Sequence, residues 1–408
     1  MDESSCLLQA LHSSLPGGCK VIRTNSYLGD PSSQGLLDVK VEIKEQISNT
    51  RECIWKCMTA AGKSMHWPGI VCSALSGCAL FITPVTVDIP DIARAANTRS
   101  YWQRGSNESG GDSTKAQAKL RVVSLGLFMK WFAGDPDFLS QYALVAFDEF
   151  DEAKYGNVAF STVLVKVRAR LAELNIKLAL LSATVPPGLV DATGIAVFDY
   201  SKRKFPLTTL DVEIDDSMDA FDVITDIGRN LLGRGHTSIC FFPGEGEISN
   251  ACERGGKEFY PFHAKLTEQQ IDAARKGTSW PRCVCSSSKG EKGTTIPDID
   301  VALCAGVARV QRDVNGFLEH LDVAVDDARC FQRMSRAGRT HAGVGLRILR
   351  TDLPNVWPTV ANMMEARVLG LTDQMRSSPF FLCKDIPSCV DAEALTRLAH
   401  FKSQDTQG

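Results

Sequence analysis

The sequence predicts an α/β protein with mostly parallel sheets, arranged as two tandem blocks. Apolar runs of strand length alternate with helical stretches along the chain, and this alternation is typical of parallel strands joined by crossover helices. One such run, residues 142–147, contains no charged residue, as expected for a strand buried on both faces. With 408 residues and 44% hydrophobic content, the chain can form two or three domains with substantial cores.

The first block is predicted to span residues 41–203 and the second residues 204–351. A basic, proline-containing stretch at residues 201–206 lies at the boundary, and we expect it to be the hinge, because it interrupts the apolar pattern. Residues 1–40 are expected to be an N-terminal extension, and residues 352–408 a small helical C-terminal region.

One segment, residues 69–87, carries no charge and has the length of a membrane span. Serine, glycine, threonine and proline interrupt it, so we expect a helix followed by a strand at residues 79–83 rather than an integral membrane span. The chain starts without a leader pattern of secretory type. A stretch rich in glycine and serine at residues 107–113 is expected to be a mobile loop.

Charge and cysteine content narrow the possible functions without choosing one. The formal net charge of −3 argues against a generally basic surface for nucleic acid, but it permits a local groove built on backbone and hydroxyl contacts. Many of the 14 cysteines lie in apolar runs, so buried reduced thiols are expected rather than disulfides. The sequence has no paired Cys-x-x-Cys sets with histidine partners, and a structural zinc site is not expected.

The tetrad Asp148-Glu149-Phe150-Asp151 directly follows the apolar run 142–147. Ligand sites in open α/β sheets lie beyond the carboxyl ends of the strands. Two adjacent carboxylates therefore stand where a nucleotide-hydrolysing enzyme holds Mg²⁺ and water. An acidic cluster after a strand is more often a solvated turn or a helix cap, so the tetrad is informative only in company with other motifs.

A second motif, Ala61-Gly62-Lys63-Ser64, lies upstream and resembles the core of a phosphate-binding loop. Such a loop needs N–H groups at a helix N-terminus, a lysine for the β/γ-phosphates and a hydroxyl for Mg²⁺. Lys63 and Ser64 supply the two side chains. The motif is incomplete because Cys57 occupies the position of its first glycine.

Four further elements follow in order, at residues 180–184, 239–244, 291–296 and 332–339. With the phosphate loop and the tetrad, they resemble the series of motifs in superfamily-two RNA helicases, which ends in a Gln-Arg-x-Gly-Arg-x-Gly-Arg element. Ser335 replaces the first glycine of that element. An arginine-rich stretch on its own is usually a solvated basic helix. The helicase interpretation therefore depends on the order in which all the elements occur.

Three stretches resemble a smaller group of these helicases, and they lie at residues 182–188, 291–300 and 343–348. These stretches are similar to the potyvirus cylindrical-inclusion helicase and to related helicases of hypoviruses and similar fungal viruses. The resemblance covers roughly residues 40–401. It implies two tandem RecA-like domains with parallel sheets and a small helical C-terminal region, with ATP and Mg²⁺ as cofactors.

In the first block, the resemblance implies a site for nucleotide and metal. Lys63 is expected to contact the β/γ-phosphates, Ser64 and Asp148 to hold Mg²⁺, and Glu149 to accept a proton from the attacking water. Ala61 and Gly62 are expected to bind the nucleotide through the loop. From the second block, the resemblance implies nucleotide binding by Gly293, catalytic orientation by Gln332, and two arginine fingers, Arg336 and Arg339.

The resemblance also implies positions for RNA binding and for coupling it to hydrolysis. Hydroxyl and loop N–H groups can hold a single-strand backbone without reading bases, although each such residue is equally compatible with a turn or a cap. The residues are Thr83, Pro84, Ser124, Gly126, Ser182, Ala183, Thr184, Phe242, Pro243 and Thr295. Alternation at residues 307–326 predicts a hairpin, either a strand-separating wedge or a plain edge hairpin.

These observations lead to the hypothesis of an ATP-dependent RNA helicase of a positive-strand-type RNA virus, with 3′ to 5′ polarity. Its partners are expected to be single-stranded RNA, RNA duplexes with an overhang, and viral replication proteins. It is expected to act in the host cytoplasm, in a replication complex that reaches membranes through partners. Two alternatives remain open: an RNA-stimulated NTPase that remodels without processive unwinding, and a self-assembling structural protein of the cylindrical-inclusion type.

Overall fold

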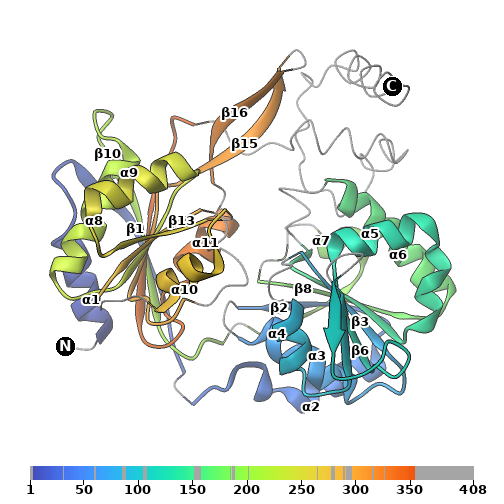
Figure 1. Ribbon diagram of the computed structural model, residues 1–408. Helices are drawn as coiled ribbons and strands as arrows, with labels where there is room; N and C mark the ends of the chain where they lie inside the picture. Colours follow the sequence, from blue (N-terminus) through green and yellow to red (C-terminus); the bar gives the residue numbers. More distant parts are fainter. Residues whose placement is uncertain are drawn as a thin grey trace.

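The chain forms two α/β blocks in the computed structural model (Figure 1). The structure describes residues 3–30, 32–58, 61–84, 89–103, 108–150, 158–183, 185, 189–200, 202–263, 265–276, 281–287, 290, 296–314, 317–325 and 327–353. Each block is built on one large sheet in which parallel pairs predominate. The predicted fold class is confirmed.

The first block contains an eight-stranded sheet in the order β5-β4-β6-β3-β7-β8-β2-β9. Its strands are β2 (Glu52–Cys57), β3 (Ala79–Thr83), β4 (Ser100–Gln103), β5 (Ser109–Gly111), β6 (Leu120–Ser124), β7 (Leu144–Asp148), β8 (Lys177–Ser182) and β9 (Ala196–Tyr200). Its helices are α2 (Lys40–Asn49), α3 (Lys63–Cys72), α4 (Ile89–Ala95), α5 (Leu125–Gly134), α6 (Val158–Glu173) and α7 (Leu189–Thr193).

Helices cover both faces of this first sheet, as its continuously apolar strands require. One apolar layer includes Ile43, Trp67 and Ile92, from α2, α3 and α4. The layer on the opposite face includes Phe128 and Leu164, from α5 and α6. The central strands β3, β6 and β7 are buried at every residue. The sheet is therefore a rigid base for the loops at its strand ends.

The second block contains a seven-stranded sheet in the order β1-β10-β17-β14-β11-β13-β12. Its strands are β1 (Cys19–Tyr27), β10 (Leu207–Ile214), β11 (Ser238–Phe241), β12 (Phe259–Phe262), β13 (Cys283–Ser286), β14 (Val301–Cys304) and β17 (Gly343–Ile348). Its helices are α1 (Glu3–His12), α8 (Ala220–Gly233), α9 (Glu245–Gly255), α10 (Glu268–Lys276) and α11 (Asp327–Met334).

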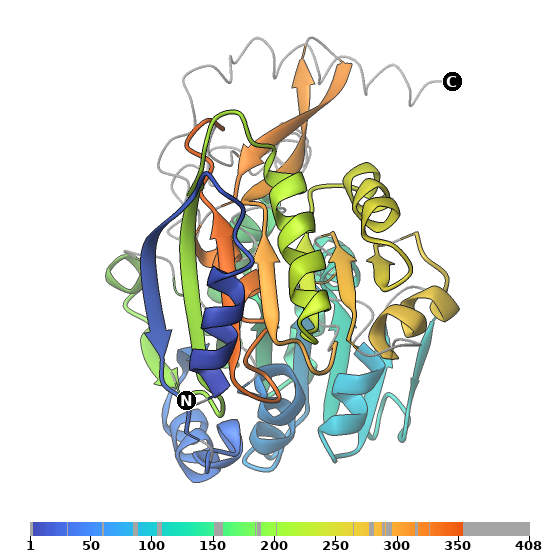
Figure 2. The ribbon, with the colours of Figure 1, turned by 90° about the vertical axis from the view of Figure 1, so that its left-hand side faces the viewer.

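The N-terminal segment is part of the second block (Figures 1 and 2). Strand β1 pairs antiparallel with β10, from Cys19 opposite Ile214 to Tyr27 opposite Leu207. Leu7 of α1 is buried in the core of this block. The prediction that residues 1–40 form an N-terminal extension is therefore wrong for residues 3–27. The sequence gives no sign of this pairing, because β1 is an edge strand with mostly exposed side chains and lacks an apolar run.

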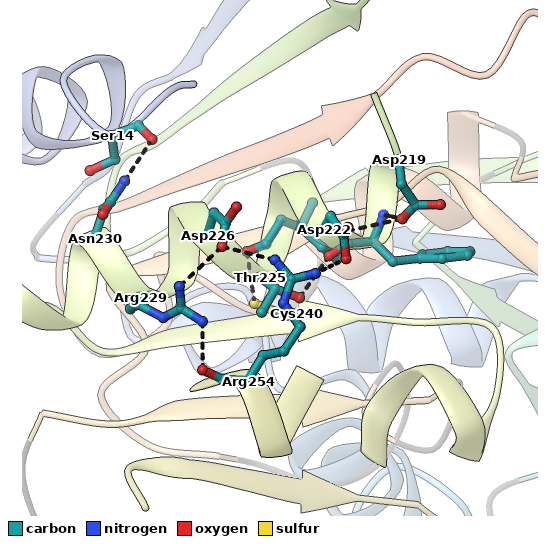
Figure 3. A network of polar contacts seen from close by, with 11 residues as sticks. Ser14, Asp219, Asp222, Thr225, Asp226, Arg229, Asn230, Cys240 and Arg254 are labelled. Atoms are coloured by element: carbon teal, nitrogen blue, oxygen red, sulfur yellow. Dashed lines mark hydrogen bonds and ion pairs between the residues drawn. The ribbon is translucent and has the colours of Figure 1, made fainter. Parts of the chain in front are cut away.

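A polar network on α8 helps to hold this arrangement (Figure 3). Asn230 Nδ2 donates to the carbonyl oxygen of Ser14, 3.3 Å away, and so links α8 to the segment after α1. Asp219 caps α8 by accepting from the N–H groups of Phe221 and Asp222. Arg254 on α9 forms ion pairs with acidic side chains of α8. The network is largely exposed, so we assign it to local orientation more than to stability.

Two chain segments cross between the blocks and lie side by side. One joins β1 to α2, and the other is the predicted hinge at residues 201–206, between β9 and β10. The N–H of Asp30 donates to the carbonyl oxygen of Arg203 over 2.8 Å. An ideal Cβ built on Gly29 would lie 2.5 Å from the backbone nitrogen of Pro206, so only glycine permits this approach. Two adjacent chain segments therefore join the two blocks at the hinge.

Other predictions about structure have mixed outcomes. The hairpin is confirmed as β15 (Val307–Val314) and β16 (Phe317–Ala324), which pair antiparallel. Residues 109–111, expected in a mobile loop, instead form β5, because they pair with the edge of β4. The uncharged segment divides into α3 and β3 as predicted. Within the described ranges, every helix is too short or too polar to span a membrane. The predicted C-terminal helical region lies almost entirely outside them.

Candidate nucleotide-binding site

The phosphate-loop motif lies at the N-terminus of α3, directly after β2. Gly62 precedes the helix with a φ of +88°, a conformation that glycine adopts without steric cost. An ideal Cβ at this position would lie 2.3 Å from Cδ2 of His66. Cys57, which replaces the first glycine, is the last residue of β2, and burial raises the pKa of its thiol to about 12. It is therefore a neutral packing residue.

The predicted lysine, serine and carboxylates converge on one point. Nζ of Lys63 lies 2.6 Å from Oε1 of Glu149 and 3.2 Å from Oδ1 of Asp148. Oγ of Ser64 donates to Oδ2 of Asp148 over 2.6 Å. The side chains of Lys63 and Asp148 are only 9% and 3% exposed. Two motifs separated by more than 80 residues in sequence thus form one cluster.

The topology of the sheet explains this convergence. Asp148 is the last residue of β7, and β7 and β2 both flank β8 in parallel. Their carboxyl ends therefore meet at the same edge, which is where ligands bind in such sheets. Glu149 has a φ of +49°, an uncommon conformation for a residue with a side chain and one that recurs at functional sites.

The electrostatics of Asp148 reflect its burial. Desolvation raises the pKa of its carboxyl above the ordinary value, while the charge of Lys63 and the hydrogen bond from Ser64 oppose that rise. The nearby charge of Glu149 adds to it. A bound divalent cation beside the carboxylate would favour its ionised form. The donor set, a hydroxyl and a carboxylate, suits Mg²⁺, which prefers oxygen ligands.

The second block contributes Arg339 to a cavity of about 240 Å³. The cavity is lined by Ala61, Gly62 and His66 of the first block, by Gly338 and Arg339 of the arginine-rich element, and by residues of the two crossing segments. Arg336 lies on the same element, three residues earlier, and is 7% exposed. The arginine-rich element therefore faces the phosphate loop across a space between the blocks.

Two other residues of this element have local contacts. Gln332 is half-buried, and its carbonyl oxygen accepts a hydrogen bond from Oγ of Ser335. Arg333 is 1% exposed, donates to the carbonyl oxygen of Val307 and packs its guanidinium over the ring of Phe241. Arg333 therefore has a structural role within the second block. Gly293, predicted to bind nucleotide, lies outside the described residues.

The residues predicted for RNA contact in the first block differ in exposure. Gly126 is exposed, and an added Cβ would meet no atom within 4 Å. Pro84 is half-buried, and Thr83 is buried at the end of β3. Ser124 is buried, and its Oγ accepts from the N–H of Leu127 as the N-cap of α5. The capping alternative therefore describes Ser124, because its hydroxyl already has this backbone partner.

The predicted RNA contacts of the second block are likewise divided. The side chain of Phe242 is fully buried in the core, so it can offer only backbone groups to RNA. Pro243 lines an open cavity of about 770 Å³ that also includes Gly244, His263, Ser287 and residues of the β15–β16 hairpin. Of the coupling residues, Ser182 and Ala183 are buried at the end of β8. Thr184 and Thr295 lie outside the described residues.

The residues that join the two blocks next to the phosphate loop are not among those predicted from the sequence. Nη2 of Arg203 donates to the carbonyl oxygen of Gly338 over 3.0 Å, and burial, then the charge of Arg339, lower the pKa of Arg203 to about 10. Tyr200 and residues 33–38 pack beside Ala61. The basic run at the hinge was the only sequence signal for the contact of Arg203 with Gly338. The sequence carries no signal for the packing of Tyr200 and residues 33–38 beside Ala61.

The fold and the order of the motifs are similar to those of superfamily-two helicases. The fold matches a crystal structure of the Escherichia coli DEAH/RHA helicase HrpB with a TM-score of 0.72 and 19% identity, over 90% of this chain and 50% of that chain. At this identity, the match establishes the fold alone. No family model matches the chain.

Sequence comparison finds distant similarity to proteins named as RNA helicases and to viral polyproteins. The chain is 24% identical over 417 residues to a Haemophilus influenzae protein named ATP-dependent RNA helicase HrpA homolog, which covers 92% of this chain and 31% of that protein. It is also 22% identical over 315 residues to the genome polyprotein of Peanut mottle virus, covering 75% of this chain and 10% of the polyprotein. The chain spans less than a third of the length of the curated relatives it matches.

Proposed function

We propose that this chain is the motor core of an ATP-dependent RNA helicase. The observation that carries the proposal is the cluster of Lys63, Ser64, Asp148 and Glu149 at the carboxyl edge of the first sheet. The ammonium group of Lys63, the hydroxyl group of Ser64 and the position of both at a helix N-terminus suit the phosphates of a nucleotide. The similarity to proteins named ATP-dependent RNA helicases supports ATP as the nucleotide.

Each residue of the cluster has a chemical role in this proposal. Lys63 leaves its two carboxylates to bind the β/γ-phosphates, and the freed Glu149 accepts a proton from the attacking water. Ser64 and Asp148 would hold Mg²⁺, which would neutralise part of the phosphate charge when bound. Arg336 and Arg339 reach the γ-phosphate from the second block when the blocks close.

RNA lies across the two blocks in this proposal. Gly126 and Pro84 mark its path on the first block, and Pro243 with the 770 Å³ cavity marks it on the second. Opening and closing of the cleft with each ATP changes the distance between these two contacts, and that change moves the strand. Backbone contacts make the movement independent of base sequence.

The ATPase rate with and without poly-U RNA tests this function. We expect stimulation by RNA, and an RNA affinity that falls as salt rises, because phosphate contacts release counterions. Unwinding of an RNA duplex with a 3′ overhang then separates a helicase from an NTPase that remodels without unwinding. A rate that ignores RNA at every salt concentration would contradict the proposal.

We further propose a viral source and a 3′ to 5′ polarity. Similarity to potyvirus polyproteins supports the viral source, although the similarity to bacterial helicases is at least as extensive. The setting would be a replication complex in the host cytoplasm, with viral replication proteins as partners. Duplexes with a 5′ overhang in place of a 3′ overhang test the polarity.

A further inference from the structure

Tyr200 stands beside the strand that leads into the phosphate loop. It ends β9, where it pairs with Cys57, the last residue of β2. Its carbonyl oxygen accepts from the N–H of Met58 over 3.1 Å, and the carbonyl oxygen of Met58 in turn accepts from the N–H of Ala61 over 3.1 Å. The side chain is only 6% exposed. Two backbone hydrogen bonds, with Met58 between them, therefore link Tyr200 to Ala61 of the loop.

The hydroxyl of Tyr200 fastens the segment of residues 33–38, here called the 33–38 turn. It donates to the carbonyl oxygen of Gly35 over 2.8 Å and lies 3.1 Å from Oγ of Ser33 and 3.3 Å from Oδ2 of Asp38. Oγ of Ser33 donates to the same Oδ2 over 2.8 Å. The turn is thus organised around one tyrosine hydroxyl and one carboxylate.

The 33–38 turn also contacts the phosphate loop directly. The N–H of Leu36 donates to the carbonyl oxygen of Ala61 over 2.9 Å. Gly35 has a φ of +68°, and an ideal Cβ there would lie 2.4 Å from that same oxygen. Ser33, Gln34 and Gly35 line the 240 Å³ cavity together with Gly62 and Arg339. The turn therefore supports the loop at the residue before Gly62.

The same segment connects the loop to the second block. Residues 28–30 precede the turn, and Asp30 is hydrogen-bonded to Arg203 of the other crossing segment. Before them lies β1, which is paired along its length with β10 of the second sheet. The second block is therefore connected by a short chain segment to the turn that contacts Ala61.

We propose that Tyr200 is a positioning residue, which holds the 33–38 turn against the phosphate loop and so sets the loop for nucleotide binding. The inference rests on the proposed ATPase function, and it adds that Tyr200 and the 33–38 turn position the phosphate loop. Tyr200 acts through the turn and does not touch the reacting atoms. Its loss should weaken nucleotide binding and leave the chemical step intact.

The test compares Tyr200→Phe with Tyr142→Phe in the full chain. Tyr142 is a matched control: it is also buried in the first block, and its hydroxyl accepts from Nη1 of Arg121, in the layer on the opposite face of the sheet. We expect Tyr200→Phe to raise the KM for ATP about tenfold, equivalent to about 1.4 kcal/mol, with kcat within about twofold. Tyr142→Phe should leave KM unchanged.

Hydrogen exchange gives a second readout that needs no turnover. The amides of Ala61 to Ser64 should exchange faster in Tyr200→Phe than in the wild-type chain or in Tyr142→Phe, because exchange reports local opening. Absence of ATPase activity in the wild-type chain would defeat the proposed function alone. Wild-type KM and wild-type exchange in Tyr200→Phe would defeat the positioning role.

Gly35→Ala tests the same contact from its other side. The added methyl group would collide with the carbonyl oxygen of Ala61 and strain a positive φ, so KM should rise at least as much as in Tyr200→Phe. Gly233→Ala is its control, because a Cβ there meets no atom within 4 Å. If Tyr200→Phe proves unstable to heat, an unchanged KM in folded Gly35→Ala overturns the proposal.

Discussion

The two halves of the proposed nucleotide site are built in different ways. In the first block, Lys63, Ser64, Asp148 and Glu149 contact one another at the edge of a single sheet. In the second block, Arg339 faces the phosphate loop across a cavity between the blocks. The first half is therefore set by local topology, and the second by the relative placement of the blocks. Substitutions in the two halves should differ in which kinetic constant they change.

The arginine-rich element should give the largest effect. Arg336→Ala and Arg339→Ala should each reduce turnover about 10³-fold, because arginine fingers stabilise charge in the transition state. Nucleotide affinity should stay within about tenfold. The measurements are single-turnover hydrolysis and nucleotide binding. Unchanged hydrolysis in both variants would show that neither arginine takes part in hydrolysis.

Arg333→Met is the matched control for these variants. Arg333 is buried between Val307 and Phe241, so its loss should lower the stability of the second block. Turnover per folded molecule should change much less than in Arg336→Ala. A circular-dichroism melt run beside the kinetic assay separates the two effects.

The first half of the site should respond next in size. Glu149→Gln should reduce hydrolysis by at least about 10²-fold, the lower range for a positioned general base. Lys63→Ala should also reduce hydrolysis strongly, because it removes the cation that contacts the β/γ-phosphates. Glu149→Gln should keep ATP binding, since it leaves Lys63 and Ser64 in place. Full turnover by Glu149→Gln, measured by phosphate release, would contradict the role of this carboxylate.

A smaller effect is expected on the RNA path. Gly126→Glu places a negative charge on an exposed residue in the first turn of α5, where acidic residues suit the helix dipole. RNA binding should weaken about tenfold at low salt, with basal ATPase unchanged. Ser124→Ala should instead cost about 1 kcal/mol of stability through the lost cap. Equal RNA affinity for wild type and Gly126→Glu would show that RNA does not pass over Gly126.

The smallest expected effect concerns stability and pH. Burial raises the pKa of Asp148, so its favourable contribution to folding is complete below the unfolded-state pKa and is lost as pH rises through the folded-state pKa. Asp148→Asn cannot ionise and should melt at a slightly higher temperature than wild type near neutral pH. The difference should shrink toward pH 4. Asp137→Asn, at an exposed ion pair, should show little change. Calorimetry across pH 4–8 is the measurement.

The sequence predicted most of the first half of the site and little of the connection to the second. Lys63 and Asp148 could be found because a helix N-terminus and a strand end have local signatures. Tyr200 could not be found, because its hydrogen bonds to the 33–38 turn join residues more than 160 apart. Phe242 lies at a strand end, where the sequence does not tell which side of the sheet a side chain occupies.

The same limit applies to the N-terminal strand. The exposed side chains of β1 carry no apolar pattern, and its assignment to the second sheet depends on pairing with β10. Long-range pairing of an edge strand has no local signal. The block boundaries near residues 40 and 203 therefore correspond to the two crossing segments, whereas residues 3–27 belong with the later block.

The pairing of β1 with β10 has a consequence for biosynthesis. Cys19 meets Ile214, so the ribosome makes β1 roughly two hundred residues before its partner. At about 5–20 residues per second, this is an interval of about 10–40 s. The nascent first block can complete its sheet during that time, while β1 and α1 wait without the surface that buries Leu7 and Leu11. Completion of the second sheet therefore requires residues 3–27 to pack against elements made after the first block.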